Sequence, residues 1–180
     1  MRVRSACCVL LLCLPLLACA QSRGERLRHL LGQRQVETGD TQSLPADARV
    51  LREVAYGPDP AQRYDVYAPA GARGLPIIAM VHGGGWSKGD KDNPGLATPK
   101  AAYWLPRGYV LVSINYRMLP DADPAVQARD VAAAIAHLQR HAQDWGGDPA
   151  RTVLMGHSAG AHLVALLGAD VAALTAVSYT

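Results

Sequence analysis

The sequence contains no phenylalanine among its 180 residues, so its large aromatic side chains are those of seven tyrosines and three tryptophans. Any hydrophobic core must therefore use aliphatic side chains, methionine, tyrosine and tryptophan. Cysteine is also scarce, because the four cysteines all lie within the first 19 residues. The remainder of the chain cannot form a disulfide, which leaves packing of the core as the source of its stability.

Charge of either sign is modest. Eighteen Lys and Arg residues against fifteen Asp and Glu residues give a formal net charge of +3. Removal of residues 1–20 would remove Arg2 and Arg4 and no acidic residue, so the charge would fall from +3 to +1. A nearly neutral chain with no basic stripe gives no support to nucleic-acid binding.

The first twenty residues have the pattern of a secretory signal. A short positive region is followed by the apolar residues 6–17 and by Ala18-Cys19-Ala20 at a cleavage point, and the stretch is too short to span a membrane. The segment Leu16 to Cys19 also resembles a bacterial lipobox, which implies a lipid on Cys19 and anchoring to a membrane. We expect an exported protein, either a periplasmic or outer-membrane-anchored lipoprotein or a simply secreted one.

The rest of the chain divides into a polar tether and one domain. Residues 21–49 lack a regular apolar pattern and are expected to form the tether, and residues 50–180 the domain. Strands are predicted over residues 50–56, 62–67, 75–81, 109–115 and 151–155, with a helix centred on 100–105 and another opened by Asp123 and Pro124. This alternation predicts an α/β fold with a mostly parallel sheet flanked by helices.

The segment Gly156-His-Ser158-Ala-Gly160 stands between a predicted strand and a helix. A tight turn there strains the serine backbone and exposes its hydroxyl, and small residues at both ends avoid a collision across the turn. Ser158 is therefore the candidate nucleophile. The pattern by itself is weak, and its setting between strand and helix makes it informative.

The second motif is His82-Gly83-Gly84-Gly85-Trp86, which follows the predicted strand 75–81. Three consecutive glycines are costly to order, so the run indicates that the backbone approaches something closely. The amides of Gly84 and Gly85, with that of Ala159, are the candidate oxyanion hole for a carbonyl attacked by Ser158. Trp86 could line an acyl pocket or hold the loop in place, and a flexible linker is the less favoured alternative for the glycines.

Both motifs, in this order, resemble those of α/β-hydrolase-fold serine esterases and lipases with an HGGG oxyanion loop, the branch of hormone-sensitive lipase, feruloyl-esterase-like enzymes and arylformamidases. The resemblance implies hydrolysis of small acyl esters or formyl amides without metal or cofactor, and a loop-shaping role for His82 and Gly83. It also implies a triad in the order Ser, acid, His. No histidine follows His162, so we expect the C-terminal part of the fold to be missing from this sequence.

The other histidines and polar residues have structural interpretations. His137 and His141 are spaced as zinc ligands can be, but no third ligand accompanies them. The loop from Lys88 to Asp92 is expected to be solvated, Asp148 to fix a turn, and residues 115–117 to support the structure. Three functions stay open: a serine carboxylesterase with little activity in this chain because the triad is incomplete, a non-catalytic remnant or ligand-binding lipoprotein, and an arylformamidase-like amide hydrolase.

Overall fold

The computed structural model describes residues 43–169. The predicted signal, Cys19 and nearly all of the tether lie outside the described residues, as do residues 170–180. In chain order the elements are β1 (Arg49–Ala55), β2 (Arg63–Ala68), β3 (Leu75–Val81), α2 (Ala97–Trp104), the 3-10 turn η1 (Leu105–Arg107), β4 (Val110–Ile114), α3 (Pro124–His141), the 3-10 turn η2 (Ala142–Trp145), β5 (Gly147–Gly156) and α4 (Ala159–Ala169). Every predicted strand and helix is present, and β5 is longer than expected.

The five strands form one sheet in the order β1-β2-β4-β3-β5. β3 pairs in parallel with β4 and β5, whereas β2 pairs antiparallel with β1 and β4. The predicted α/β class is confirmed, and in the described part of the chain the sheet is mixed. The physical reason is the short turn between β1 and β2, which returns the chain as a hairpin, whereas a parallel pairing needs a crossover of a dozen or more residues.

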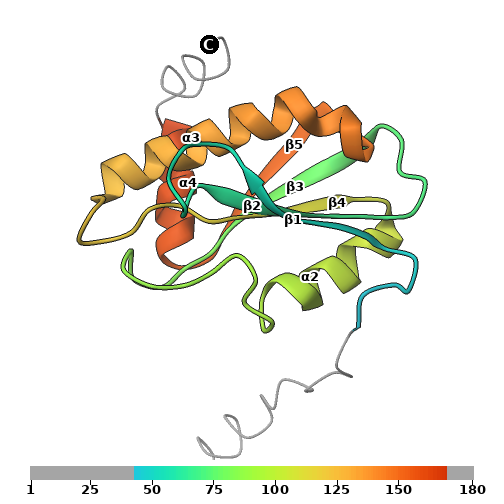
Figure 1. Cartoon of the computed structure of the whole chain (residues 1–180), viewed down its shortest axis with the longest axis horizontal. Helices are drawn as coiled ribbons and strands as arrows, with labels where there is room; N and C mark the ends of the chain where they lie inside the picture. The colour runs from blue at the N-terminus through green and yellow to red at the C-terminus, as the bar shows by residue number, and fades with distance from the viewer. Residues whose placement is uncertain (1–42, 170–180) are drawn as a thin grey trace, which may run out of the picture. The chain divides into compact units, whose positions relative to one another are not determined.

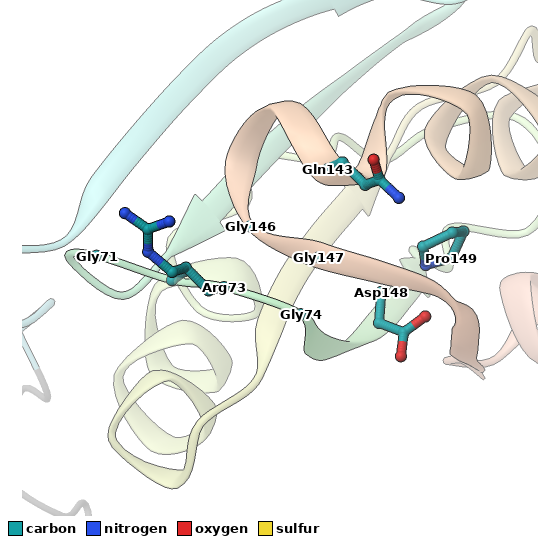
Figure 2. A pocket seen from close by; sticks show the side chains of 9 residues that line it. Gly71, Arg73, Gly74, Gln143, Gly146, Gly147, Asp148 and Pro149 are labelled. Carbon is teal, nitrogen blue, oxygen red and sulfur yellow. The ribbon is translucent and has the colours of Figure 1, made fainter.

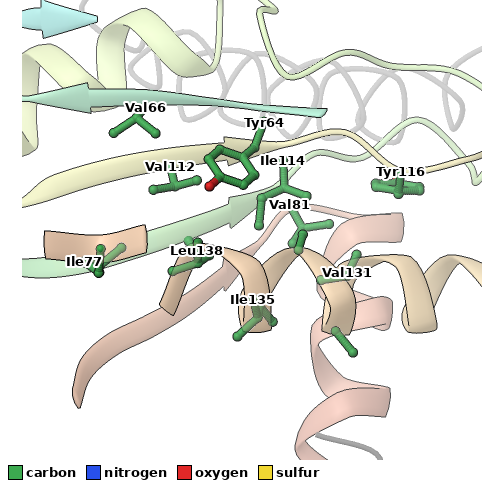
Figure 3. Close-up of a cluster of buried hydrophobic side chains, with 14 of the residues drawn as sticks. Tyr64, Val66, Ile77, Val81, Val112, Ile114, Tyr116, Val131, Ile135 and Leu138 are labelled. Atoms are coloured by element: carbon green, nitrogen blue, oxygen red, sulfur yellow. The ribbon is translucent and has the colours of Figure 1, made fainter. Parts of the chain in front are cut away.

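Helices cover both faces of the sheet, with α3 and α4 on one face and α2 on the other (Figure 1). Alternate side chains of each strand supply the two cores, as in β2, where Tyr64 and Val66 face α3 while Tyr67 faces α2. Figure 3 shows the core under α3, where Ile135 and Leu138 point toward the strands. One face of this helix is apolar and packs on the sheet, because the following residues are buried: Val131, Ala134, Ile135 and Leu138.

Helix α3 begins as the sequence predicts. The Asp123 side chain accepts a hydrogen bond of 2.8 Å from the amide of Val126, and Pro124 occupies the first turn, where a missing N–H costs nothing. Beyond the helix, Gly146 caps the end of η2, and its φ of 86° lies in the left-handed region that glycine adopts easily. The chain then enters β5. None of the helices within residues 43–169 is both long and apolar enough to cross a membrane.

Candidate active site

The glycine loop, which we define as His82 to Trp86, and the turn at Ser158 lie side by side because β3 and β5 are parallel neighbours. Val81 at the end of β3 pairs with Gly156 at the end of β5, and the amide of His157 donates a hydrogen bond of 3.2 Å to the carbonyl of Val81. Two motifs about 75 residues apart in sequence therefore meet at the carboxyl edge of the sheet, because parallel strands end at the same edge.

Gly83 makes a close approach between the two motifs. A Cβ atom on Gly83 would lie 2.7 Å from the carbonyl oxygen of His157 and 3.0 Å from Cβ of Ser158. Any other residue at this position would force the loop away from the turn. This contact is the physical reason for glycine at position 83.

The backbone at Ser158 is strained as predicted, with φ at 52°, in the left-handed region that a residue with a side chain rarely adopts. The two flanking glycines have no room for a side chain. A Cβ on Gly156 would lie 2.5 Å from the Cα of Ala161, and one on Gly160 would overlap the carbonyls of Val81 and His82. Ser158 itself is exposed and immediately precedes α4, so the positive end of that helix lies next to its hydroxyl.

The backbone of the glycine loop is also in the left-handed region. The φ angles are 126° at Gly84, 61° at Gly85 and 61° at Trp86. Within residues 43–169, the amides of Gly84, Gly85 and Ala159 donate no hydrogen bond to the protein. Three free N–H donors on two adjacent turns form the kind of arrangement that can bind a developing oxyanion.

His82 is buried within the fold. Its ring stacks on Tyr116 with centroids 4.6 Å apart, its Nδ1 donates to the carbonyl of Gly83 at 2.7 Å, and its own carbonyl accepts a hydrogen bond of 3.0 Å from the Tyr116 hydroxyl. Burial lowers the pKa of His82, which favours the neutral ring. These contacts are those expected of a loop-shaping residue.

Trp86 is tied to the fold by its backbone and by its ring. Its carbonyl accepts hydrogen bonds of 2.9 Å from Nε2 of Gln127 and from the amide of Leu119, and its ring packs edge-on against His162 with centroids 5.5 Å apart. The sequence left two roles open for Trp86, and these contacts favour holding the loop. Gln127 was missed, since a lone glutamine in a helical sequence gives no sign that α3 will bury it.

None of the histidines within residues 43–169 hydrogen-bonds the Ser158 hydroxyl. His157 and His162 are exposed, and the Nδ1 of the partly buried His137 lies 3.0 Å from the Tyr64 hydroxyl. His141 contacts Asp144 at 3.1 Å. No group of three or more side chains suited to a metal ion occurs in the described part of the chain.

The polar residues outside the two motifs support the fold, with one correction. Arg151 binds the Asp148 carboxylate at 2.7 Å, and Arg117 binds that of Asp130. The expectation that Lys88 to Asp92 form only a solvated loop is wrong at Lys91, whose side chain is 5% exposed and pairs with Asp65 and Glu53. The sequence could not reveal this ion pair, because Asp65 lies on β2 and is remote from Lys91 in sequence. The alternation of polar and apolar residues along β2 does not show that Asp65 faces a buried part of the fold.

Among the hollows in residues 43–169, two lie at opposite ends of the parallel strands. One, of about 600 Å³, adjoins the glycine loop and is bordered by His157, Asp90, Asn93 and Leu96. The other, of about 440 Å³, is shown in Figure 2 between Arg73 and Asp148. Its residues precede or begin β3 and β5, at the edge remote from Ser158, so only the first hollow can receive a group bound to the candidate nucleophile.

The chain resembles esterases in both sequence and structure. It is 37% identical over 119 residues to a probable isoprenylcysteine alpha-carbonyl methylesterase of Oryza sativa subsp. japonica, covering 66% of this chain and 27% of that protein. It is 35% identical over 119 residues to the esterase LipC of Mycobacterium tuberculosis, covering 65% of this chain and 29% of that protein. This chain thus spans less than a third of the length of these relatives.

Among solved structures, the chain is similar to esterase B from Lactobacillus rhamnosis, with a TM-score of 0.63 and 29% identity over 87% of this chain and 49% of that one. The esterase Est2 of Thermogutta terrifontis matches with a TM-score of 0.55 and 30% identity, over 67% of this chain and 43% of that one. A family model described as BD-FAE matches residues 64–175, more than half of the sequence. On this match and on the esterase relatives, the chain belongs to the BD-FAE family of carboxylesterase-type α/β-hydrolases.

Proposed function

We propose that the protein is an exported serine carboxylesterase that works through an acyl-enzyme on Ser158. The observation that carries this proposal is the contact between the two motifs at Gly83. It brings an exposed, strained serine and the free amides of Gly84, Gly85 and Ala159 to one edge of the sheet. A nucleophile next to preorganised N–H donors is the arrangement that acyl transfer requires.

In the proposed reaction, Oγ of Ser158 forms a bond to the ester carbonyl carbon while the carbonyl π electrons move to its oxygen. The amides of Gly84, Gly85 and Ala159 stabilise that oxyanion by hydrogen bonding. Collapse of the intermediate expels the alcohol, which takes up a proton, and leaves the acyl group on Ser158. Water then attacks the acyl-enzyme, releases the carboxylic acid and restores the serine hydroxyl.

A general base has to accept the Ser158 proton in this reaction. Since no histidine within residues 43–169 hydrogen-bonds that hydroxyl, we propose that this chain by itself turns over slowly. Loss of the base from a serine triad costs on the order of 10⁶-fold in kcat, and a residual rate from oxyanion stabilisation and binding remains.

The proposed substrates are small carboxylic esters, with one group of the ester in the hollow beside the glycine loop. Two features support this choice. The relatives are named esterases, one of them for a methyl ester, and the hollow of about 600 Å³ lies within the range of small-molecule sites. We propose no resident metal or cofactor, since the reaction steps above need only side chains, backbone amides and water.

Labelling with a fluorophosphonate probe tests the nucleophile. We expect slow covalent labelling of the folded chain, because no histidine within residues 43–169 is placed to accept the Ser158 proton. The labelling should be lost in Ser158→Ala and kept in Ser87→Ala, a matched variant at an exposed serine beside the glycine loop. Labelling that persists in Ser158→Ala would assign the reactivity to another residue. Absence of labelling in folded, unaltered protein would contradict the proposal for this chain and favour a non-catalytic role.

Export and lipidation form a separate part of the proposal, supported by the sequence pattern of residues 1–20. We propose anchoring to a membrane through a lipid on Cys19. Expression in a bacterial host with labelled palmitate should give a labelled protein, and Cys19→Ala should abolish the label while Cys13→Ala keeps it. An unlabelled protein released from the cells would favour simple secretion instead.

A further inference from the structure

Lys91 is buried, although its neighbours in sequence, residues 87–90 and 92–95, are exposed. Its ammonium group pairs with the carboxylate of Glu53 and lies 3.2 Å from Oδ1 of Asp65, a side chain with no exposed surface. Asp65 also accepts a hydrogen bond of 2.7 Å from Arg52 and one of 2.9 Å from the amide of Glu53. Burial by itself would lower the pKa of Lys91, but the two carboxylates raise it above its ordinary value, so the ammonium form is favoured.

The backbone of Lys91 is held as firmly as its side chain. Its amide donates a hydrogen bond of 2.6 Å to Oδ1 of Asn115, and its carbonyl accepts one of 2.7 Å from Oγ of Ser113. Asn115 also donates to the carboxylate of Asp90 at 3.2 Å. Residues 90 and 91 are therefore fixed to β4 and to the residues immediately after it.

The residues just before Lys91 support the glycine loop directly. The amides of Ser87 and Lys88 donate to the carbonyl of Gly84 at 3.3 and 3.2 Å. A Cβ on Gly84 would overlap the carbonyl of Lys88, and a Cβ on Gly89 would overlap the carbonyl of Gly83. The peptide groups of residues 83 and 84 thus pack against residues 88 and 89. These lie two to three positions before Lys91 in the sequence.

We propose that Lys91 is a positioning residue for the glycine loop. Its ion pair with Asp65 holds residues 87–91 against Gly83 and Gly84, and this contact aims the free amides of the loop toward the carbonyl oxygen of a substrate at Ser158. A buried ion pair contributes little to stability compared with apolar groups of equal size, because desolvation offsets the attraction. It does, however, fix the position of the chain, since the ammonium group must meet both carboxylates at once. The catalytic consequence rests on the proposed function, but the positioning does not.

Hydrogen exchange followed by NMR tests the positioning without any turnover. In Lys91→Met we expect the amides of Ser87 and Lys88 to exchange at least about tenfold faster than in the unaltered chain, and this rise to exceed that of the core amides of β4, which report the change in global stability. Lys88→Met is the matched control, because its side chain is exposed and makes no ion pair among residues 43–169, and it should leave these rates unchanged. Unchanged Ser87 and Lys88 rates in a folded Lys91→Met variant would overturn the proposal.

If Lys91→Met does not fold, Glu53→Gln decides instead. It removes only the charge of the partner whose side chain is 66% exposed and keeps Asp65 in place. We then expect a rise of about two- to threefold in the same two exchange rates, and no rise refutes the proposal. Where the chain hydrolyses an ester, Lys91→Met should lower kcat about tenfold or more with KM little changed, since the loop acts on the transition state. A chain that neither hydrolyses nor labels contradicts the proposed function alone, and the exchange rates still decide the role of Lys91.

Discussion

Substitution of Gly160 by alanine tests how closely α4 packs on the glycine loop. The added methyl group would overlap the carbonyls of Val81 and His82 and would lie 2.8 Å from the carbonyl carbon of Val81. These atoms cannot move easily, because Val81 belongs to a strand paired on both sides and its carbonyl accepts the hydrogen bond of His157.

The expected cost follows from two opposing effects. Alanine is about 1 kcal/mol more favourable than glycine within a helix, whereas overpacking costs about 1–3 kcal/mol and here meets backbone rather than a flexible side chain. Because rigid backbone puts the overpacking cost near its upper end, about 3 kcal/mol, we expect Gly160→Ala to lower the free energy of unfolding by about 2 kcal/mol. Gly168 lies in the same helix, and none of residues 43–169 would come within 4 Å of a Cβ there, so Gly168→Ala should stabilise by about 0.5–1 kcal/mol through helix formation.

Urea denaturation followed by circular dichroism measures both variants. The two should differ by about 3 kcal/mol in unfolding free energy, which for a chain of this size is about 6–12 °C in Tm. Equal stability of the two variants would refute the packing of Gly160 against the end of β3, and with it the close contact between the two motifs.

Two further predictions concern the groups around the loop. Gln127→Leu removes the hydrogen bonds from Nε2 to the carbonyls of Trp86 and Ala122. Urea denaturation should show a free energy of unfolding lower by about 1–3 kcal/mol. The control Gln143→Leu, at an exposed site, should change it by less than about 0.5 kcal/mol. Since burial lowers the pKa of His82, the unfolded chain binds a proton more readily, so stability should fall as the pH drops below the ordinary value of 6.5. In His82→Gln this dependence should be weaker, and an unchanged pH profile of the unfolding free energy would exclude His82 as its source.

The sequence by itself determined the elements and the two motifs. Residue alternation and the apolar runs predicted the strands, and Asp123 with Pro124 predicted the start of α3, because capping and helix-breaking effects depend on residues close in sequence. The turn at Ser158 was equally accessible, since its strain and its flanking glycines are local.

Only the tertiary structure decided which remote residues meet. The strand order places β3 beside β5 and thereby brings Gly83 against Ser158. The fold also pairs Asp65 with Lys91 and brings Gln127 of α3 within hydrogen-bond distance of the Trp86 carbonyl. Ion pairs and hydrogen bonds between remote segments leave no periodic mark in a sequence, because each depends on a single pair of positions that the folded backbone alone brings together. For that reason the sequence predicted the chemistry of the two motifs, while the support of the glycine loop became visible only in the fold.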